Sequence, residues 1–283
     1  MSNTFTYKQI NDVEIKAELF PTEQKAAPLI VYIHGGGLIW GTRKDINKEQ
    51  VELFNNNGYH VLSIAYRLAP ETKLPEIVND IRDSLEWVKE ELPKHIDYNH
   101  NKVIVIGNSA GGYLALMTGT FENKPNAIIS FYGYGNILGE WYSTPSDYFN
   151  TMPKVNEALA NQLIRKNEVA EAPITARYAI YLYCRQQGVW PEFVTDPAST
   201  DLSQYCPVNL VDNSFPPTLL LHGDADEDVP YDESVKMQEA LEQHQVKNKL
   251  VTIPNGKHQF DENMSNPAVI AAFNEILEFL KEI

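Results

Sequence analysis

The chain has 283 residues, of which 43% are hydrophobic and 22% are charged. This length and composition predict a globular protein with a substantial core, and α/β folds of this size commonly form a single unit. The 38 acidic and 23 basic residues give a net charge of −15, which disfavours contact with nucleic acid or with an anionic membrane. We therefore expect neither of these as a partner.

The N-terminus and the cysteines predict a cytoplasmic protein. Residues 1–16 lack the basic start and apolar run of a secretory signal. No stretch approaches the roughly 18 apolar residues of a membrane span. Cys184 and Cys206 are too few for a disulfide framework or a zinc site. We expect both to be reduced, with a single bridge between them as the open alternative.

The first predicted elements are strands. Residues 4–9 and 13–20 alternate apolar and polar side chains around a polar turn, which predicts an antiparallel hairpin. Six later segments are short, continuous and apolar, a pattern typical of parallel strands that are buried on both faces. These segments are residues 28–34, 59–66, 102–107, 126–133, 217–223 and 249–254.

Helical patterns lie between these strands. Residues 76–91 carry apolar side chains at steps of three and four, and residues 110–121 are small and apolar. Residues 232–245 and 267–282 are amphipathic. The alternation of strand and helix predicts an α/β fold, with a mostly parallel central sheet and helices on both of its faces.

One segment, residues 134–206, breaks this alternation. It has helical pieces at 154–167 and 173–188, several prolines and many aromatic residues, but no convincing strand pattern. A connection of this length is too long for a plain loop. We predict one domain from residues 1–133 and 207–283, and an inserted helical cap subdomain from residues 134–206. The aromatic residues suit either a cover over an apolar site or the insert's own core.

The segment GNSAG at residues 107–111 fits the nucleophile elbow G-x-S-x-G. It follows a predicted strand and begins a predicted helix, which is the context that the motif requires. In such a turn the hydroxyl of Ser109 is exposed, and side chains at positions 107 and 111 would collide with the backbone. The alternative is an ordinary serine that caps a helix. Asn108 has no assigned role.

The segment HGGG begins at His34, at the end of the first predicted parallel strand. Consecutive glycines allow close approach of the backbone to a ligand, with free N–H groups. The amides of Gly36 and Gly37, joined by that of Ala110, are candidate donors to an oxyanion, and each such donor contributes about 3 kcal/mol. A flexible turn or a phosphate loop is the alternative, but no phosphate-binding pattern is present. His34 suits a role in orienting the loop.

A serine nucleophile needs a histidine base, and that base needs an orienting carboxylate. Among the seven histidines, His258 lies in a short loop between the last predicted strand and the last predicted helix. Loops at this end of a parallel sheet line the active site. The loop at residues 222–230 carries four acids, of which we favour Asp226 over Asp228 as the orienting residue. Such a cluster also occurs in solvated turns and, less often, in metal sites.

Together these motifs resemble the α/β-hydrolase superfamily, and they are most similar to the HGGG-type carboxylesterases that include hormone-sensitive-lipase-like enzymes. Five segments match in the family's order: HGGG at 34–37, YRLAPE at 66–71, GNSAGG at 107–112, HGDADEDVP at 222–230 and GKHQF at 256–260. The resemblance extends over residues 5–282 except the insert, which occupies the usual cap position. Ala65 departs from the family, which often has an acid there.

The resemblance implies a serine esterase that cleaves small carboxylic esters through an acyl-enzyme intermediate. It assigns Ser109 as nucleophile, His258 as base, Asp226 as orienting acid, and Gly36, Gly37 and Ala110 as oxyanion donors. It implies a small-molecule ester as partner, and neither a metal nor a cofactor. A prolyl-oligopeptidase-like serine exopeptidase is the nearest alternative, because the loop at 222–230 also resembles the acid loop of those peptidases. A non-catalytic binding protein on a hydrolase scaffold is the alternative from another class.

Overall fold

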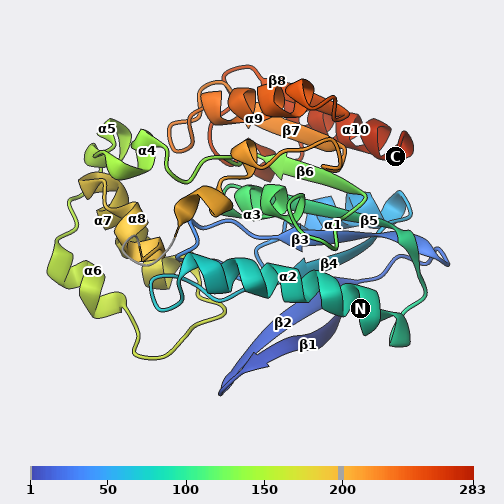
Figure 1. The fold of residues 1–283 in the computed structure, drawn as a ribbon, viewed down its shortest axis with the longest axis horizontal. Helices are drawn as coiled ribbons and strands as arrows, with labels where there is room; N and C mark the ends of the chain where they lie inside the picture. Colours follow the sequence, from blue (N-terminus) through green and yellow to red (C-terminus); the bar gives the residue numbers. More distant parts are fainter. Residues whose placement is uncertain (1, 197–200) are drawn as a thin grey trace.

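The computed structural model describes residues 2–196 and 201–283, and its centre is one eight-stranded sheet (Figure 1). The strand order is β1-β2-β4-β3-β5-β6-β7-β8, and only the pairs β1–β2 and β2–β4 are antiparallel. The strands are β1 (Asn3–Ile10), β2 (Val13–Phe20), β3 (Ala27–Ile33), β4 (His60–Ile64), β5 (Tyr98–Asn108), β6 (Ala127–Phe131), β7 (Thr218–Gly223) and β8 (Asn248–Ile253). The predicted hairpin and all six predicted parallel strands are confirmed as strands. Strand β8, at the edge of the sheet, is only partly buried, contrary to the prediction of burial on both faces.

Burial on both faces explains the continuous apolar runs of the inner parallel strands. Along β3, Leu29, Val31 and Ile33 enter the core on one face of the sheet, while Ile30 and Tyr32 enter the core on the other. Every residue of β4, β6 and β7 is buried. The apolar pattern in the sequence therefore reflects two cores that share one sheet.

Helices cover both faces of the sheet, as predicted. Helices α2 (Leu74–Glu90), α3 (Ala110–Thr118) and α9 (Asp232–Gln243) contribute to one core, and α1 (Lys48–Asn56) and α10 (Pro267–Lys281) to the other. Helix α1 was not predicted, because its amphipathic pattern is short and its buried face includes a glutamine. None of the helices in the described parts of the chain is long and apolar enough to cross a bilayer.

The segment 134–206 forms short helices, which gather at one end of the sheet in Figure 1. Its α-helices are α4 (Glu140–Ser143), α5 (Asp147–Asn150), α6 (Glu157–Leu163), α7 (Ile174–Gln187) and α8 (Trp190–Val194). The helix predicted over 154–167 is shorter than expected, because Asn156 caps its start and the chain is extended again at Ile164. The segment joins β6 to β7, and its status as a separate subdomain stays a prediction. Residues 197–200 lie outside the described residues.

Helix α7 is anchored to the sheet domain by a buried ion pair. Arg177 donates to both carboxylate oxygens of Glu71, at 3.1 and 2.6 Å, and to the carbonyl of Ala69 at 2.7 Å. The two charged side chains are only 2% and 3% exposed. Glu71 and Ala69 belong to the segment YRLAPE, so this motif holds the helical segment in place. The two cysteines of residues 134–206, Cys184 and Cys206, are both buried, and neither forms a disulfide bond.

Replacement Arg177→Ala is expected to lower the free energy of unfolding by about 3 kcal/mol, because it leaves the carboxylate of Glu71 buried without its cation. Urea denaturation followed by tryptophan fluorescence measures this change. The matched control is Arg165→Ala, at an exposed position of the same segment, for which we expect a change within about 0.5 kcal/mol. Equal losses in the two variants would contradict an anchoring role for Arg177.

Candidate active site

Ser109 lies on a strained turn between β5 and α3. Its backbone has φ 54° and ψ −122°, and its hydroxyl makes no capping hydrogen bond to the helix, which is contrary to the capping alternative. A β-carbon at Gly107 would lie 2.0 Å from the carbonyl oxygen of Gly111, and one at Gly111 would lie 2.1 Å from that of Ile33. Both glycines are therefore required for the turn, and the turn leaves the serine hydroxyl free to face a neighbouring loop.

Three of the predicted residues meet at the carboxyl ends of the parallel strands. His258, in the loop after β8, places Nε2 3.1 Å from the hydroxyl of Ser109 and Nδ1 2.8 Å from Oδ2 of Asp226. Asp226 lies in the loop after β7. The arrangement is a continuous chain from hydroxyl to imidazole to carboxylate, which is the geometry of a serine nucleophile activated by a base.

The carboxylate of Asp226 is fully buried and accepts several hydrogen bonds. Its Oδ1 accepts from the backbone amides of Asp228 at 2.8 Å and Val229 at 3.0 Å, and its Oδ2 faces two imidazoles. Burial raises the pKa of this carboxyl, but the hydrogen bonds from His222 and His258 outweigh burial and hold the pKa well below its usual range. Asp226 is therefore an anion at neutral pH.

His222 is the second imidazole on Asp226, and sequence reasoning did not assign it. Its Nε2 lies 3.2 Å from Oδ2 of Asp226 and 3.1 Å from the carbonyl of Val229, and its Nδ1 lies 2.7 Å from the hydroxyl of Ser234. Since both neighbours of Nε2 accept hydrogen bonds, Nε2 carries the proton and Nδ1 accepts from the serine. The side chain thus fixes the position of the acid. The available signal was the position of His222 near the carboxyl end of β7, next to the acidic loop.

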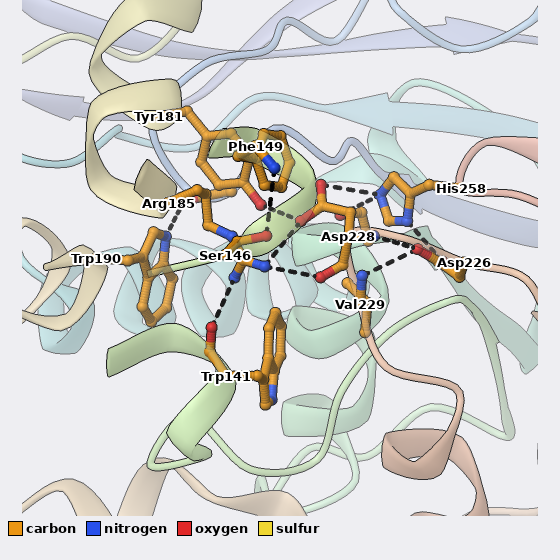
Figure 2. Close-up of polar contacts among 12 residues, drawn as sticks. Trp141, Ser146, Phe149, Tyr181, Arg185, Trp190, Asp226, Asp228, Val229 and His258 are labelled. Atoms are coloured by element: carbon orange, nitrogen blue, oxygen red, sulfur yellow. Dashed lines mark hydrogen bonds and ion pairs between the residues drawn. The ribbon is translucent and has the colours of Figure 1, made fainter. Parts of the chain in front are cut away.

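Asp228 does not contact Nδ1 of His258. Its Oδ2 lies 3.8 Å from Nε2, which is the nitrogen that contacts the hydroxyl of Ser109. Figure 2 shows Asp228 beside the ring of His258. The structure therefore places Asp226, and not the second candidate Asp228, in the position that orients the histidine.

The glycine loop has the backbone freedom that its sequence predicts. Gly36 and Gly37 have φ of +104° and +60°, a region that favours glycine. The carbonyl of Gly37 accepts a hydrogen bond from Nε1 of Trp190 at 2.9 Å, and a β-carbon on Gly37 would lie 2.4 Å from the ring of Tyr181. In the loops that the structure describes, the amides of Gly36 and Gly37 donate no backbone hydrogen bond. Ala110 is the first residue of α3, so its amide has no partner within the helix.

His34 supports this loop and lies away from the reacting groups. It is 1% exposed, stacks on Tyr66 with ring centres 4.3 Å apart, and places Nδ1 2.8 Å from the carbonyl of Gly35. The hydroxyl of Tyr66 donates to the carbonyl of His34 at 3.0 Å. Burial lowers the pKa of His34, which keeps the ring neutral. These contacts fit the predicted role in orienting the loop.

A cavity of 510 Å³ opens above Ser109. One wall comes from the helical segment and is aromatic, with Tyr148, Phe149, Tyr178 and Tyr181. Polar side chains also line the cavity, and we call four of them the polar wall: Gln50, Asn108, Tyr132 and Asp261. The cavity therefore offers one apolar and one hydrogen-bonding surface to a ligand that reaches the serine.

The polar wall contains a network that the sequence did not reveal. Tyr132 donates to Oδ1 of Asp261 at 2.6 Å and accepts from Nδ2 of Asn108 at 3.3 Å, and Gln50 donates to Oδ2 of Asp261 at 2.9 Å. Burial, and then the charge of Asp261, raise the pKa of Tyr132 well above its usual range, so the phenol stays protonated. Its ring centre is 4.6 Å from that of His258. Asn108, to which the sequence assigned no role, therefore lies in the wall of the cavity.

The acids around Asp226 have partners within the protein. Asp224 accepts from the amide of Asn255 at 2.6 Å, and Glu227 pairs with Lys257 at 2.6 Å. Among the described residues, no group of three or more His, Cys, Asp and Glu side chains is arranged to hold a metal ion.

The sequence matches the family described as the alpha/beta hydrolase fold over residues 30–262 of the 283. The chain belongs to this family. The matched residues include the nucleophile elbow at 107–111, the glycine loop at 34–37 and the loop after β8 that carries His258.

Solved structures share the fold over the whole chain. An α/β-hydrolase superfamily protein from Enterococcus faecalis is 29% identical with a TM-score of 0.81, and the match covers 100% of this chain and 99% of that one. A protein of unknown function from Staphylococcus aureus Mu50 is 25% identical, with the same TM-score and coverage. A thermophilic esterase from Thermogutta terrifontis has a TM-score of 0.70 at 21% identity, covering 99% and 92% of the chains, and shows the shared fold alone.

Curated relatives include much longer proteins. The non-reducing polyketide synthase atr1 of Stereocaulon alpinum is 29% identical over 306 residues, which cover 91% of this chain and 12% of the synthase. The non-reducing polyketide synthase Preu3 of Preussia isomera is 27% identical over 92% of this chain and 12% of the synthase. The chain thus spans about an eighth of the length of these relatives.

Proposed function

We propose that the protein is a carboxylic ester hydrolase with Ser109 as its nucleophile. The observation that carries the proposal is the hydrogen-bonded chain of Ser109, His258 and Asp226, with distances of 3.1 and 2.8 Å, at the floor of a 510 Å³ cavity. The aromatic wall of the cavity supports small, fairly apolar esters as substrates.

In this mechanism Ser109 attacks the ester carbonyl while Nε2 of His258 accepts its proton. The amides of Gly36, Gly37 and Ala110 donate to the developing oxyanion. The imidazolium then protonates the leaving alcohol, and an acyl-enzyme remains on the serine. His258 next deprotonates a water molecule, which attacks the acyl-enzyme and releases the carboxylic acid. Asp226 accepts a hydrogen bond from Nδ1 of His258 throughout and stabilises the transient imidazolium.

A serine exopeptidase is the second candidate, because carboxylates also line the cavity. Asp228, Asp261 and Glu262 reach its surface, and a peptidase of this kind needs acids to bind the free amine of its substrate. The same nucleophile and base would cleave an amide in that case.

Hydrolysis assays with two sets of chromogenic substrates test the proposal. We expect turnover of p-nitrophenyl acetate and butyrate, and at most weak turnover of aminoacyl p-nitroanilides. A preference for the anilides would favour the exopeptidase. A fluorophosphonate probe should attach to Ser109, as mass spectrometry of the peptide would show. A protein that neither turns over any of these substrates nor reacts with the probe would instead be a binding protein on a hydrolase scaffold.

A further inference from the structure

Asp228 is held by helix α7 through two side chains. The hydroxyl of Tyr181 donates to its Oδ1 at 2.6 Å, and Nη2 of Arg185 donates to its backbone carbonyl at 2.9 Å. The same guanidinium nitrogen lies 3.6 Å from Oδ1. Figure 2 shows both side chains reaching Asp228 from the helix. One helix of the segment 134–206 therefore fixes both the backbone and one carboxylate oxygen of this residue.

Arg185 is itself fixed among aromatic rings. Its side chain is 3% exposed, and its guanidinium lies 4.9, 5.1 and 5.2 Å from the ring centres of Trp141, Tyr142 and Phe149. It also donates to the carbonyl of Trp141 at 3.3 Å. Such cation–π contacts are strongest when the cation is removed from water. The contact to Asp228 thus comes from a side chain with little freedom to move.

On its other side, Asp228 lies against two members of the proposed triad of Ser109, His258 and Asp226. Its backbone amide donates to Oδ1 of Asp226 at 2.8 Å, and its own Oδ2 lies 3.8 Å from Nε2 of His258. That separation is too long for a hydrogen bond, so the interaction with the imidazole is electrostatic. The ring therefore has a carboxylate near each nitrogen, and both favour the imidazolium that forms when Ser109 loses its proton.

We propose that Asp228 is a positioning residue, which couples helix α7 to the triad and stabilises positive charge on His258 from the side of Ser109. The inference rests on the proposed ester hydrolase function. The other titratable groups that act on His258 or lie against it are Asp226, Asp261, Glu262 and Tyr132. Those that act on or lie against Asp228 are Tyr134, Tyr178, Tyr181 and Arg185.

The balance of charges around the ring agrees with this assignment. Burial lowers the pKa of His258, but the charge of Asp228 and then the hydrogen bond and charge of Asp226 outweigh burial, so that the pKa is raised above its ordinary value. Asp228 and Asp226 thus both favour the imidazolium, against the effect of burial.

The test is Asp228→Asn, which removes the charge but keeps an acceptor for Tyr181 and the shape of the side chain. We expect the midpoint of the His258 titration, followed by NMR of its Cε1 proton, to fall by about one pH unit. The acidic limb of kcat/KM for p-nitrophenyl acetate, and that of fluorophosphonate labelling, should move with it. The plateau of kcat/KM should fall by about tenfold, because the transient imidazolium loses a stabilising charge.

Two further variants separate this role from a structural one. Asp224→Asn makes the same charge change at an exposed position of the same loop, and we expect the midpoint to stay within about 0.3 pH units. Tyr181→Phe keeps the ring on Gly37 but removes the donor to Asp228, so the plateau should fall about threefold while the midpoint does not fall. An unchanged midpoint in Asp228→Asn would overturn the proposal.

The outcomes also distinguish this inference from the proposed function. A wild-type protein that hydrolyses no ester and resists the fluorophosphonate would refute the function, while the NMR titration would still read the coupling between Asp228 and His258. Circular dichroism checks that each variant folds. Should Asp228→Asn not fold, Tyr181→Phe decides, and an undiminished plateau in that variant would overturn the coupling to helix α7.

Discussion

Replacement Ser109→Ala is expected to lower kcat/KM for p-nitrophenyl acetate by at least about 10⁴-fold, which corresponds to about 5 kcal/mol of transition-state stabilisation. In the proposed mechanism the hydroxyl is the attacking group, so its loss removes the acyl-enzyme route. The fold should be unaffected, because this hydroxyl makes no capping bond and its hydrogen-bond partner is a side chain of the same site, His258. Initial rates at saturating and subsaturating ester concentrations measure the loss.

The control for this variant is Ser143→Ala, at an exposed serine whose hydroxyl donates to the carbonyl of Glu140 at 3.3 Å. Its kcat/KM should remain within twofold of the wild-type value. Fluorophosphonate labelling should be present in the control and lost in Ser109→Ala. Substantial turnover by Ser109→Ala would place the chemistry at another residue.

Asp226→Asn should lower kcat by about 10³- to 10⁴-fold through the tautomer of His258. Two backbone amides, those of Asp228 and Val229, donate to Oδ1, so an asparagine here would keep its oxygen on that side. Its NH₂ group would then face both imidazoles. Nδ1 of His258 would have to accept, Nε2 would carry the proton, and the serine would lose its base.

Single-turnover release of p-nitrophenol, with thermal unfolding measured beside it, tests this expectation. The matched comparison is Asp228→Asn, because both variants exchange one carboxylate for an amide in the same loop. We expect the loss at Asp226 to exceed the loss at Asp228 by about 10²-fold or more. The reverse order would make Asp228 the orienting acid.

The sequence predicts the sheet well because a strand that is buried on both faces has a continuous run of apolar residues. The inner parallel strands contain short apolar runs, and the residues of β4, β6 and β7 are all buried. Helix α1 was not predicted because its buried face is narrow and consists of Gln50, Val51 and Phe54. Short polar helices at the surface carry little periodic signal.

The sequence favours Asp226 over Asp228, but it does not show how the two carboxylates point, because both lie in one loop two residues apart. The backbone amides of residues 228 and 229 turn the carboxylate of Asp226 inward, and only the folded loop reveals this. The network of Gln50, Tyr132 and Asp261 was missed for another reason. Its members are far apart in the chain, and no local pattern joins them.

The contact between Trp190 and the carbonyl of Gly37 bears on how such proteins could be recombined. Residues 134–206 supply this indole, the ring of Tyr181 against the same glycine, and the Arg185 contact to Asp228. Exchanging the segment for that of a relative would therefore alter the loops that present the proposed oxyanion donors and the acid, and not substrate access alone. A working chimaera should keep these three side chains, or replace them with groups that reach the same backbone atoms.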